Sequence, residues 1–99
     1  MEKERLKNNV FLRDASPLVL IRLYKDKLVG KHSYAHSLSK KLDITYSHLF
    51  KLIKIFERHN LISGRRVGRT RLLFLTEDGL LLAKNMEIVY NQSKNVSYF

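Results

Sequence analysis

The side chains best suited to chemistry in this sequence are cationic, and they are concentrated in its middle. Residues 30–75 hold ten Lys and Arg against two Asp and Glu, a net charge of +8 out of +10 for the whole chain. Residues 1–29 carry +3, and residues 76–99 carry −1. Positive charge gathered on one part of a small domain is typical of a protein that binds a polyanion. A generally basic surface is the alternative, but it would spread the charge along the whole chain.

Other chemistries find little support in the residue types and spacings. His32 and His36 lie four residues apart, but His32 precedes the expected helix, and no cysteine or acidic residue is nearby to complete a metal site. The sequence also lacks paired carboxylates, a nucleophile elbow and a glycine-rich phosphate loop. We therefore expect no enzymatic activity, no metal and no cofactor.

The stretch from Tyr34 to Asn60 is predicted to form two helices joined by a tight turn. The first helix carries Ala35, Leu38 and Leu42 on one face. The second carries the i, i+3, i+4, i+7 stripe of an amphipathic helix, made of Leu49, Leu52, Ile53 and Phe56. Between them, Ile44 fills the angle between the helices, and Thr45 can cap the second helix through its hydroxyl. This is the pattern of a helix-turn-helix.

One helix is predicted before this motif and one hairpin after it. The helix starts at Ser16-Pro17 and ends near Leu28, ahead of Gly30. In the hairpin, Gly68-Arg69 suits a two-residue type II′ turn. The resulting cross-strand pairs are Val67 with Thr70, Arg66 with Arg71, and Ile62 with Leu75, so that Leu73 and Leu75 face the core. The hairpin tip carries Arg65, Arg66, Arg69 and Arg71. Like charges opposite one another destabilise a sheet, so this tip indicates an anionic partner.

The last predicted helix runs from Thr76, its cap, to about Asn91, with two acidic residues in its first turn. One apolar stripe would close the domain, and it consists of Leu82, Met86 and Val89 with Tyr90 beside them. Leu81 and Ile88 are left over, and leftover apolar surface on a terminal helix indicates a subunit contact. A helix sunk deep in the domain is the alternative, but a core of this size has little depth. We expect a homodimer whose contact includes Leu81, Leu82, Met86, Ile88 and Val89.

Two segments carry a resemblance to a known family. They are AHSLSKKLDITYSHLFKLIKIFERHNLI at Ala35–Ile62 and LTEDG at Leu75–Gly79. They resemble winged-helix regulators of the multiple-antibiotic-resistance (MarR) type and the small winged-helix regulators of archaea and their viruses. The resemblance implies an α+β, mainly helical fold, a winged helix-turn-helix with a two- to three-stranded β-wing and a C-terminal helix. In such folds residues 31–33 form a small strand that pairs with the hairpin, and Ser33 then caps the first motif helix.

The resemblance also implies how DNA would be bound. The second motif helix would enter the major groove and present Thr45, Tyr46, Ser47, His48, Phe50, Lys51 and Lys54. Ser47 and Lys51 are the best candidates for base edges. Phe50 could meet a thymine methyl group or fold back on the hairpin, but we favour its being an additional core residue. Phosphates would be bound by Ser37, Lys40 and Lys41. Arg69 would enter the minor groove, while the DNA backbone would be held by Arg65, Arg66 and Arg71.

We expect a single domain over residues 1–99, with an N-terminal arm or short helix at 1–15, a winged-helix core at 16–76, a C-terminal helix at 77–91 and a tail at 92–99. The expected function is a homodimeric, sequence-specific regulator of transcription that binds double-stranded DNA. We expect it in the cytoplasm, at the nucleoid or, if viral, in the host cytoplasm, with no membrane association. The alternatives are a non-specific architectural DNA-binding protein and a winged-helix protein-interaction module.

Overall fold

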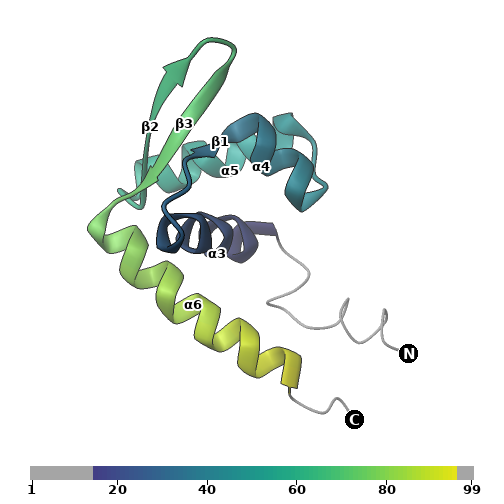
Figure 1. The fold of residues 1–99 in the computed structure, drawn as a ribbon, viewed down its shortest axis with the longest axis vertical. Coiled ribbons are helices and arrows are strands. Elements are labelled where there is room, and N and C mark those ends of the chain that lie inside the picture. The colour runs from purple at the N-terminus through teal and green to yellow at the C-terminus, as the bar shows by residue number, and fades with distance from the viewer. Residues whose placement is uncertain (1–14, 96–99) are drawn as a thin grey trace.

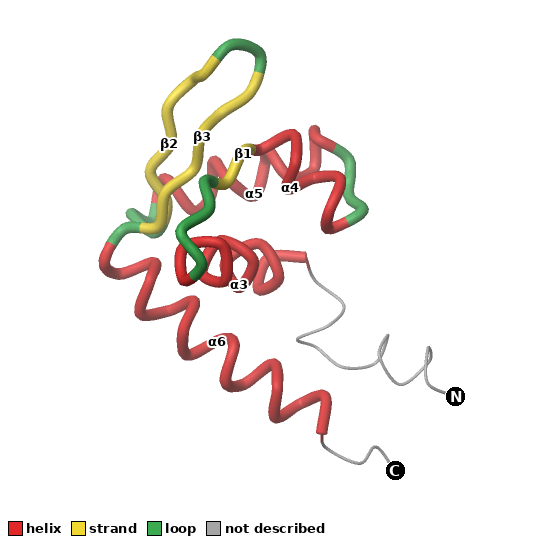
Figure 2. The backbone as a smooth tube through the Cα atoms, in the orientation of Figure 1, coloured by secondary structure: helices red, strands yellow, loops and turns green. Residues whose placement is uncertain are grey.

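The computed structural model describes residues 15–95, which form four helices and three strands (Figure 1). In chain order they are α3 (Ala15–Leu28), β1 (Ser33–Tyr34), α4 (Ala35–Leu42), α5 (Tyr46–Arg58), β2 (Ile62–Val67), β3 (Thr70–Leu75) and α6 (Glu77–Asn95). The helices α3, α4 and α5 form one body, the β2–β3 hairpin projects from it, and α6 runs along α3 (Figure 2). This is the mainly helical α+β fold predicted from the sequence. The predictions for residues 1–14 and 96–99 lie outside the described residues.

One core joins all the helices to the base of the hairpin. Its buried residues are Val19, Leu20, Leu23, Ala35, Leu38, Leu49, Leu52, Ile53, Phe56, Ile62, Leu73, Leu75 and Ala83. The predicted stripe of α5 is among them, so the amphipathic pattern identified the buried face of that helix correctly. Because α5 buries this face in the common core, beside α4 and β2, its opposite face is left to solvent.

The turn between α4 and α5 has the chemistry expected of a helix-turn-helix. Asp43 ends α4 in a left-handed conformation, with φ of 55°. Thr45 caps α5, since its Oγ1 accepts a hydrogen bond of 3.0 Å from the His48 backbone N–H. Ile44 is half-buried against the core between the two helices. Both the cap and the position of Ile44 confirm the prediction.

The three strands form an antiparallel sheet in the order β1-β3-β2. The register pairs Val67 with Thr70, Arg66 with Arg71 and Ile62 with Leu75, as predicted. Gly68 has a positive φ of 61° and Arg69 does not, which is the pattern of a type II′ turn. The short strand β1 pairs with β3 at Leu72 and Leu73, so the predicted third strand is also confirmed.

The start of α6 is fixed closely against the end of α5. Thr76 caps α6 by accepting the Gly79 N–H at 3.0 Å, and its own hydroxyl donates to the Asn60 carbonyl oxygen at 2.7 Å. Gly79 lies directly on the Leu61 backbone: a Cβ there would be 2.8 Å from the Leu61 carbonyl carbon and would overlap its oxygen. The glycine of the LTEDG segment is therefore required by the close approach of two backbones.

Three predictions about element ends and faces were wrong. Ser33 does not cap α4: the cap position is Tyr34, which makes no side-chain bond there. The pairing of Ser33 with Leu73 turns the Ser33 side chain toward α3 instead.

The core-facing side of α6 also differs in part from the prediction, which named Leu82, Met86 and Val89. Leu80, Ala83 and Met86 face the core, and Ala83 is fully buried. Leu82 lies outside the core and is 37% exposed. The helix also continues to Asn95 instead of ending near Asn91.

Candidate nucleic-acid interface

The outer face of α5 is polar and cationic. Ser47, His48, Lys51 and Lys54 are all exposed on it. They lie opposite the buried Leu49 and Ile53, so packing orients the helix and leaves these four side chains available. Thr45 is exposed just before the helix, although its hydroxyl is already used in the cap.

Three rings and one lysine form a row that begins on α4 and continues along α5, which we call the aromatic row. The rings of His36 and Tyr46 stack with centroids 4.4 Å apart, and those of Tyr46 and Phe50 are 6.4 Å apart and nearly parallel. The Lys54 Nζ lies 5.1 Å from the centre of the Phe50 ring, within cation–π range. Tyr46 packs against the core, but Phe50 is only half-buried and lies outside the core cluster. The interpretation of Phe50 as an additional core residue is therefore wrong.

Helix α4 brings a second set of polar groups next to α5. Ser37, Lys40 and Lys41 are exposed, as a phosphate-binding role requires. The start of α4 is held to the hairpin, because the His36 backbone N–H donates to Thr70 Oγ1 at 3.1 Å. The hairpin, α4 and the aromatic row are thus joined by direct contacts.

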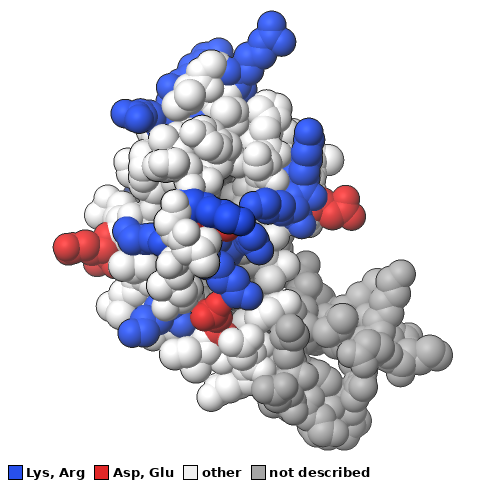
Figure 3. Space-filling model, viewed as in Figure 1, with Lys and Arg blue, Asp and Glu red and all other residues white. Residues whose placement is uncertain are grey.

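The hairpin extends beyond α4 and α5 and carries exposed cations. Arg65, Arg66 and Arg69 are exposed, and the Arg66 Nε–H donates to the Gly68 carbonyl oxygen at 3.2 Å. Figure 3 shows blue Lys and Arg side chains at the hairpin tip and across the level of the helices below it. The hairpin and the C-terminal end of α6 lie at opposite ends of the molecule (Figure 1).

Comparisons with known proteins identify this arrangement of elements. No protein-family model matches the chain. A protein of Archaeoglobus fulgidus, itself uncharacterised, is 25% identical over 95 residues, which are 96% of this chain and 98% of that protein. The crystal structure of AF1382 from Archaeoglobus fulgidus superposes with a TM-score of 0.76 at 23% identity, over 82% of this chain and 89% of that one.

Two further solved structures are regulators. MepR, a transcription regulator of the Staphylococcus aureus multidrug efflux pump MepA, matches with a TM-score of 0.71 at 18% identity, over 95% of this chain and 71% of MepR. PcaV, a transcriptional regulator from Streptomyces coelicolor, matches with a TM-score of 0.64 at 15% identity, over 76% of this chain and 55% of PcaV. This chain therefore spans about half the length of PcaV. The fold is that of winged-helix regulators.

Within this winged helix, α5 is the second helix of the helix-turn-helix and the β2–β3 hairpin is the wing. One wing arginine differs from the other three. Arg71 is half-buried, and its Nη2 donates to Glu57 Oε2 of α5 at 3.0 Å. The guanidinium thus fastens the wing to α5, an internal contact that the expected role of Arg71 at the DNA backbone did not include.

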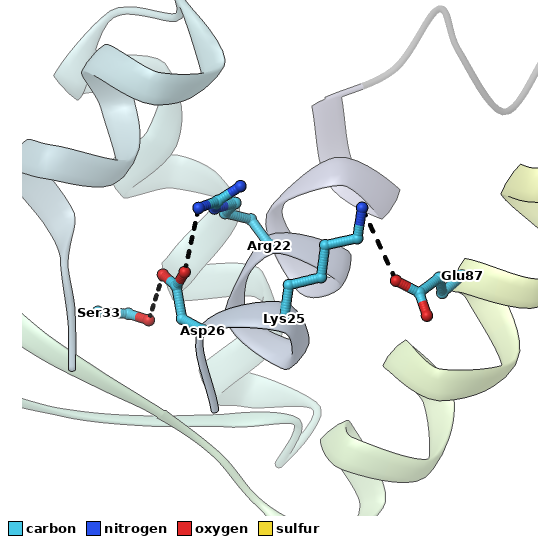
Figure 4. A network of polar contacts seen from close by, with 5 residues as sticks. All are labelled: Arg22, Lys25, Asp26, Ser33 and Glu87. Carbon is cyan, nitrogen blue, oxygen red and sulfur yellow. Dashed lines mark hydrogen bonds and ion pairs between the residues drawn. The ribbon is translucent and has the colours of Figure 1, made fainter. Parts of the chain in front are cut away.

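The winged helix also contains a polar network that sequence reasoning missed (Figure 4). Asp26 of α3 is only 3% exposed, and it accepts the Ser33 hydroxyl at 3.0 Å and lies 3.3 Å from the Arg22 guanidinium. Nearby, the Lys25 Nζ lies 3.8 Å from Glu87 of α6. The spacing of Arg22 and Asp26, four apart on a helix, was a usable signal for the first pair. The contacts with Ser33 and Glu87 carried no sequence signal, since they join separate elements.

Two features are absent from residues 15–95. No group of three or more His, Asp or Glu side chains in that range is placed to hold a metal ion. No helix in the same range has the length and apolar character needed to cross a membrane.

Proposed function

We propose that this protein is a homodimeric transcription regulator that binds double-stranded DNA at specific sequences, without enzymatic activity. The observation that carries the proposal is the exposed, cationic outer face of α5 beside an arginine-tipped wing. An α-helix fits the major groove of B-form DNA, where each base pair presents a distinct pattern of donors and acceptors. The similarity of the fold to the regulators MepR and PcaV supports the same role.

The exposed residues divide into two kinds of contact. Ser47 and Lys51 lie at the centre of the outer face of α5 and are proposed to contact base edges, with Tyr46, His48 and Lys54 beside them. Ser37, Lys40 and Lys41 of α4, together with Arg65 and Arg66, are proposed to bind phosphates, which position a protein without reading sequence. Arg69 at the wing tip is proposed to enter the minor groove.

The apolar face of α6 supports the homodimer. Leu81 is 61% exposed and Ile88 is 50% exposed, one above the other on the helix surface, with Leu82 beside them. Met86 and Val89 are half-buried and would border this contact. Because α6 packs against α3 and runs away from the wing, while α5 packs on α4 and β2, a second copy could pair there without covering α5 (Figure 1).

The decisive experiment is a selection of bound duplexes from a random pool with purified protein at physiological salt. We expect enrichment of a pseudo-palindromic site whose half-sites are about one helical turn apart, or a multiple of it. Sedimentation of the free protein at micromolar concentration should show a dimer.

Two other results would redirect the proposal. Binding to unrelated duplexes with equal affinity and a steep salt dependence would indicate a non-specific, architectural role. Absence of any salt-sensitive binding to DNA would indicate a protein-interaction module.

A further inference from the structure

The aromatic row places an apolar ring on a surface that is otherwise polar. Phe50 lies outside the core cluster, and its neighbours along the outer face of α5 are Ser47, Lys51 and Lys54, all exposed. The ring is nevertheless held in place. Tyr46 stacks on one side of it, Lys54 lies over it, and Tyr46 is itself fixed by His36. A half-buried phenyl group supported in this way is a rigid contact surface.

The chemistry of Phe50 restricts what it can recognise. A phenyl ring can neither donate nor accept a conventional hydrogen bond, so it cannot read the polar atoms of a base edge. The major groove offers one apolar group, the C5 methyl of thymine, and phenylalanine is among the side chains that contact it. The nearby Lys51 and Lys54 would at the same time bind phosphates or purine acceptors.

We propose that the aromatic row gives this protein a preference for thymine at one position of each half-site. Phe50 packs there against the C5 methyl group of the thymine. This inference rests on the proposed function, because it requires α5 to lie in the major groove. It goes beyond that function in naming the base, the atom recognised and the residues that hold the ring in position. Tyr46 and His36 act as positioning residues for Phe50.

The test removes the methyl group from the DNA and the ring from the protein. In the selected duplex, each thymine is replaced in turn by deoxyuridine, which lacks only the C5 methyl group. For the unaltered protein we expect one position in each half-site at which this replacement weakens binding about fourfold, as expected for one buried methyl group. For Phe50→Ala we expect weaker binding to the thymine duplex and equal affinity for thymine and deoxyuridine at that position.

A matched control separates this contact from a general effect of losing a phenyl group. Phe74→Ala removes a 42% exposed ring from β3, where it lines a separate cavity of about 290 Å³ with residues of α3 and the 30–33 loop. This variant should keep the full discrimination between thymine and deoxyuridine. Thermal unfolding should confirm that Phe50→Ala is folded, as expected for a residue outside the core.

The possible results are distinguishable. Discrimination in the unaltered protein that Phe50→Ala abolishes supports the inference. Sequence-selective binding in which no deoxyuridine replacement matters, or in which Phe50→Ala discriminates as before, overturns the inference and leaves the proposed function standing. Failure to recover any preferred sequence overturns both.

Discussion

At the scale of single residues, a few side chains hold separate parts of the chain in contact. The Ser33 hydroxyl joins β1 to the buried carboxylate of Asp26 in α3. Gly79 lets α6 begin directly against the Leu61 backbone. Neither contact involves the outer face of α5, so their loss should lower stability before it alters recognition.

Replacing Ser33 by Ala should destabilise the fold by about 1.5–3 kcal/mol, the usual contribution of a hydrogen bond to a charged group. The Asp26 carboxylate is buried and would lose one of the two side-chain partners that it has among residues 15–95. Urea unfolding followed by circular dichroism measures the change. Ser63→Ala, at an exposed position of β2, is the control and should stay within about 0.5 kcal/mol of the original protein. Equal midpoints for the two variants would contradict this assignment.

Replacing Gly79 by Ala should also destabilise the protein, by about 1–3 kcal/mol or more, because the added Cβ would overlap the Leu61 carbonyl. In a domain of this size, each kcal/mol lowers the Tm by about 4–8 °C. Asn85→Ala, at an exposed position of the same helix, should leave the Tm nearly unchanged. An unchanged Tm for Gly79→Ala would show that α6 can move away from Leu61 without cost.

At the scale of elements, the features that could be predicted from the sequence are those that depend on residues close together in the chain. The turn at Asp43–Thr45, the cap of α5 and the register of the wing each depend on residues close together in sequence, and all three were predicted correctly. Predictions failed where the outcome depends on contacts between distant elements. The Glu57–Arg71 ion pair arises because the folded wing passes α5. The core-facing side of α6 is set by where Ala83 meets the rest of the core.

In the candidate site, too, the features set by nearby residues were predictable and the contacts between separate elements were not. Amphipathic spacing was sufficient to predict which side chains α5 presents, because burial of Leu49 and Ile53 determines the opposite face. It could not show that Phe50 joins an aromatic row, since that depends on His36 of α4 meeting Tyr46. Nor could it separate Arg71, which binds Glu57, from the exposed wing arginines.

The two kinds of wing arginine should differ in the salt dependence of DNA binding. Arg69→Ala should reduce the slope of log K against log salt concentration by about one per protomer, as expected for a lost charge contact with DNA. Arg71→Ala should leave the slope unchanged, because its guanidinium is paired with Glu57. Titrations at several salt concentrations measure both. A similar loss of slope in the two variants would return Arg71 to the DNA contact.

At the scale of the whole molecule, the protein has a cationic surface on the wing and α5 and an exposed apolar surface on α6. The wing extends from the helices in one direction, and α6, which carries the exposed Leu81, Leu82 and Ile88, runs past α3 in the other direction (Figure 1). Binding of two half-sites would then require both surfaces at once, and separating the subunits should weaken binding without altering α5.

The variant Leu81→Glu with Ile88→Glu should be monomeric at micromolar concentration, because it places charges in the proposed contact. Its thermal stability as a folded monomer should be retained, since both positions are at least half exposed. Its affinity for the full palindrome should fall to that for a single half-site. Sedimentation and titration measure the two effects, with Leu28→Glu, an exposed site on α3, as the control. A dimer that survives the double substitution would place the contact elsewhere.

The two-residue turn and the paired strands limit how the length of the wing can vary among related proteins. Side chains along a strand alternate between the two faces of the sheet. One residue added to β3 would therefore move every side chain on one side of the insertion to the opposite face. Leu73 and Leu75 would then leave the core while Phe74 entered it. Related sequences should therefore lengthen this wing at its tip, between Val67 and Thr70, and should leave the number of residues between Thr70 and Leu75 unchanged.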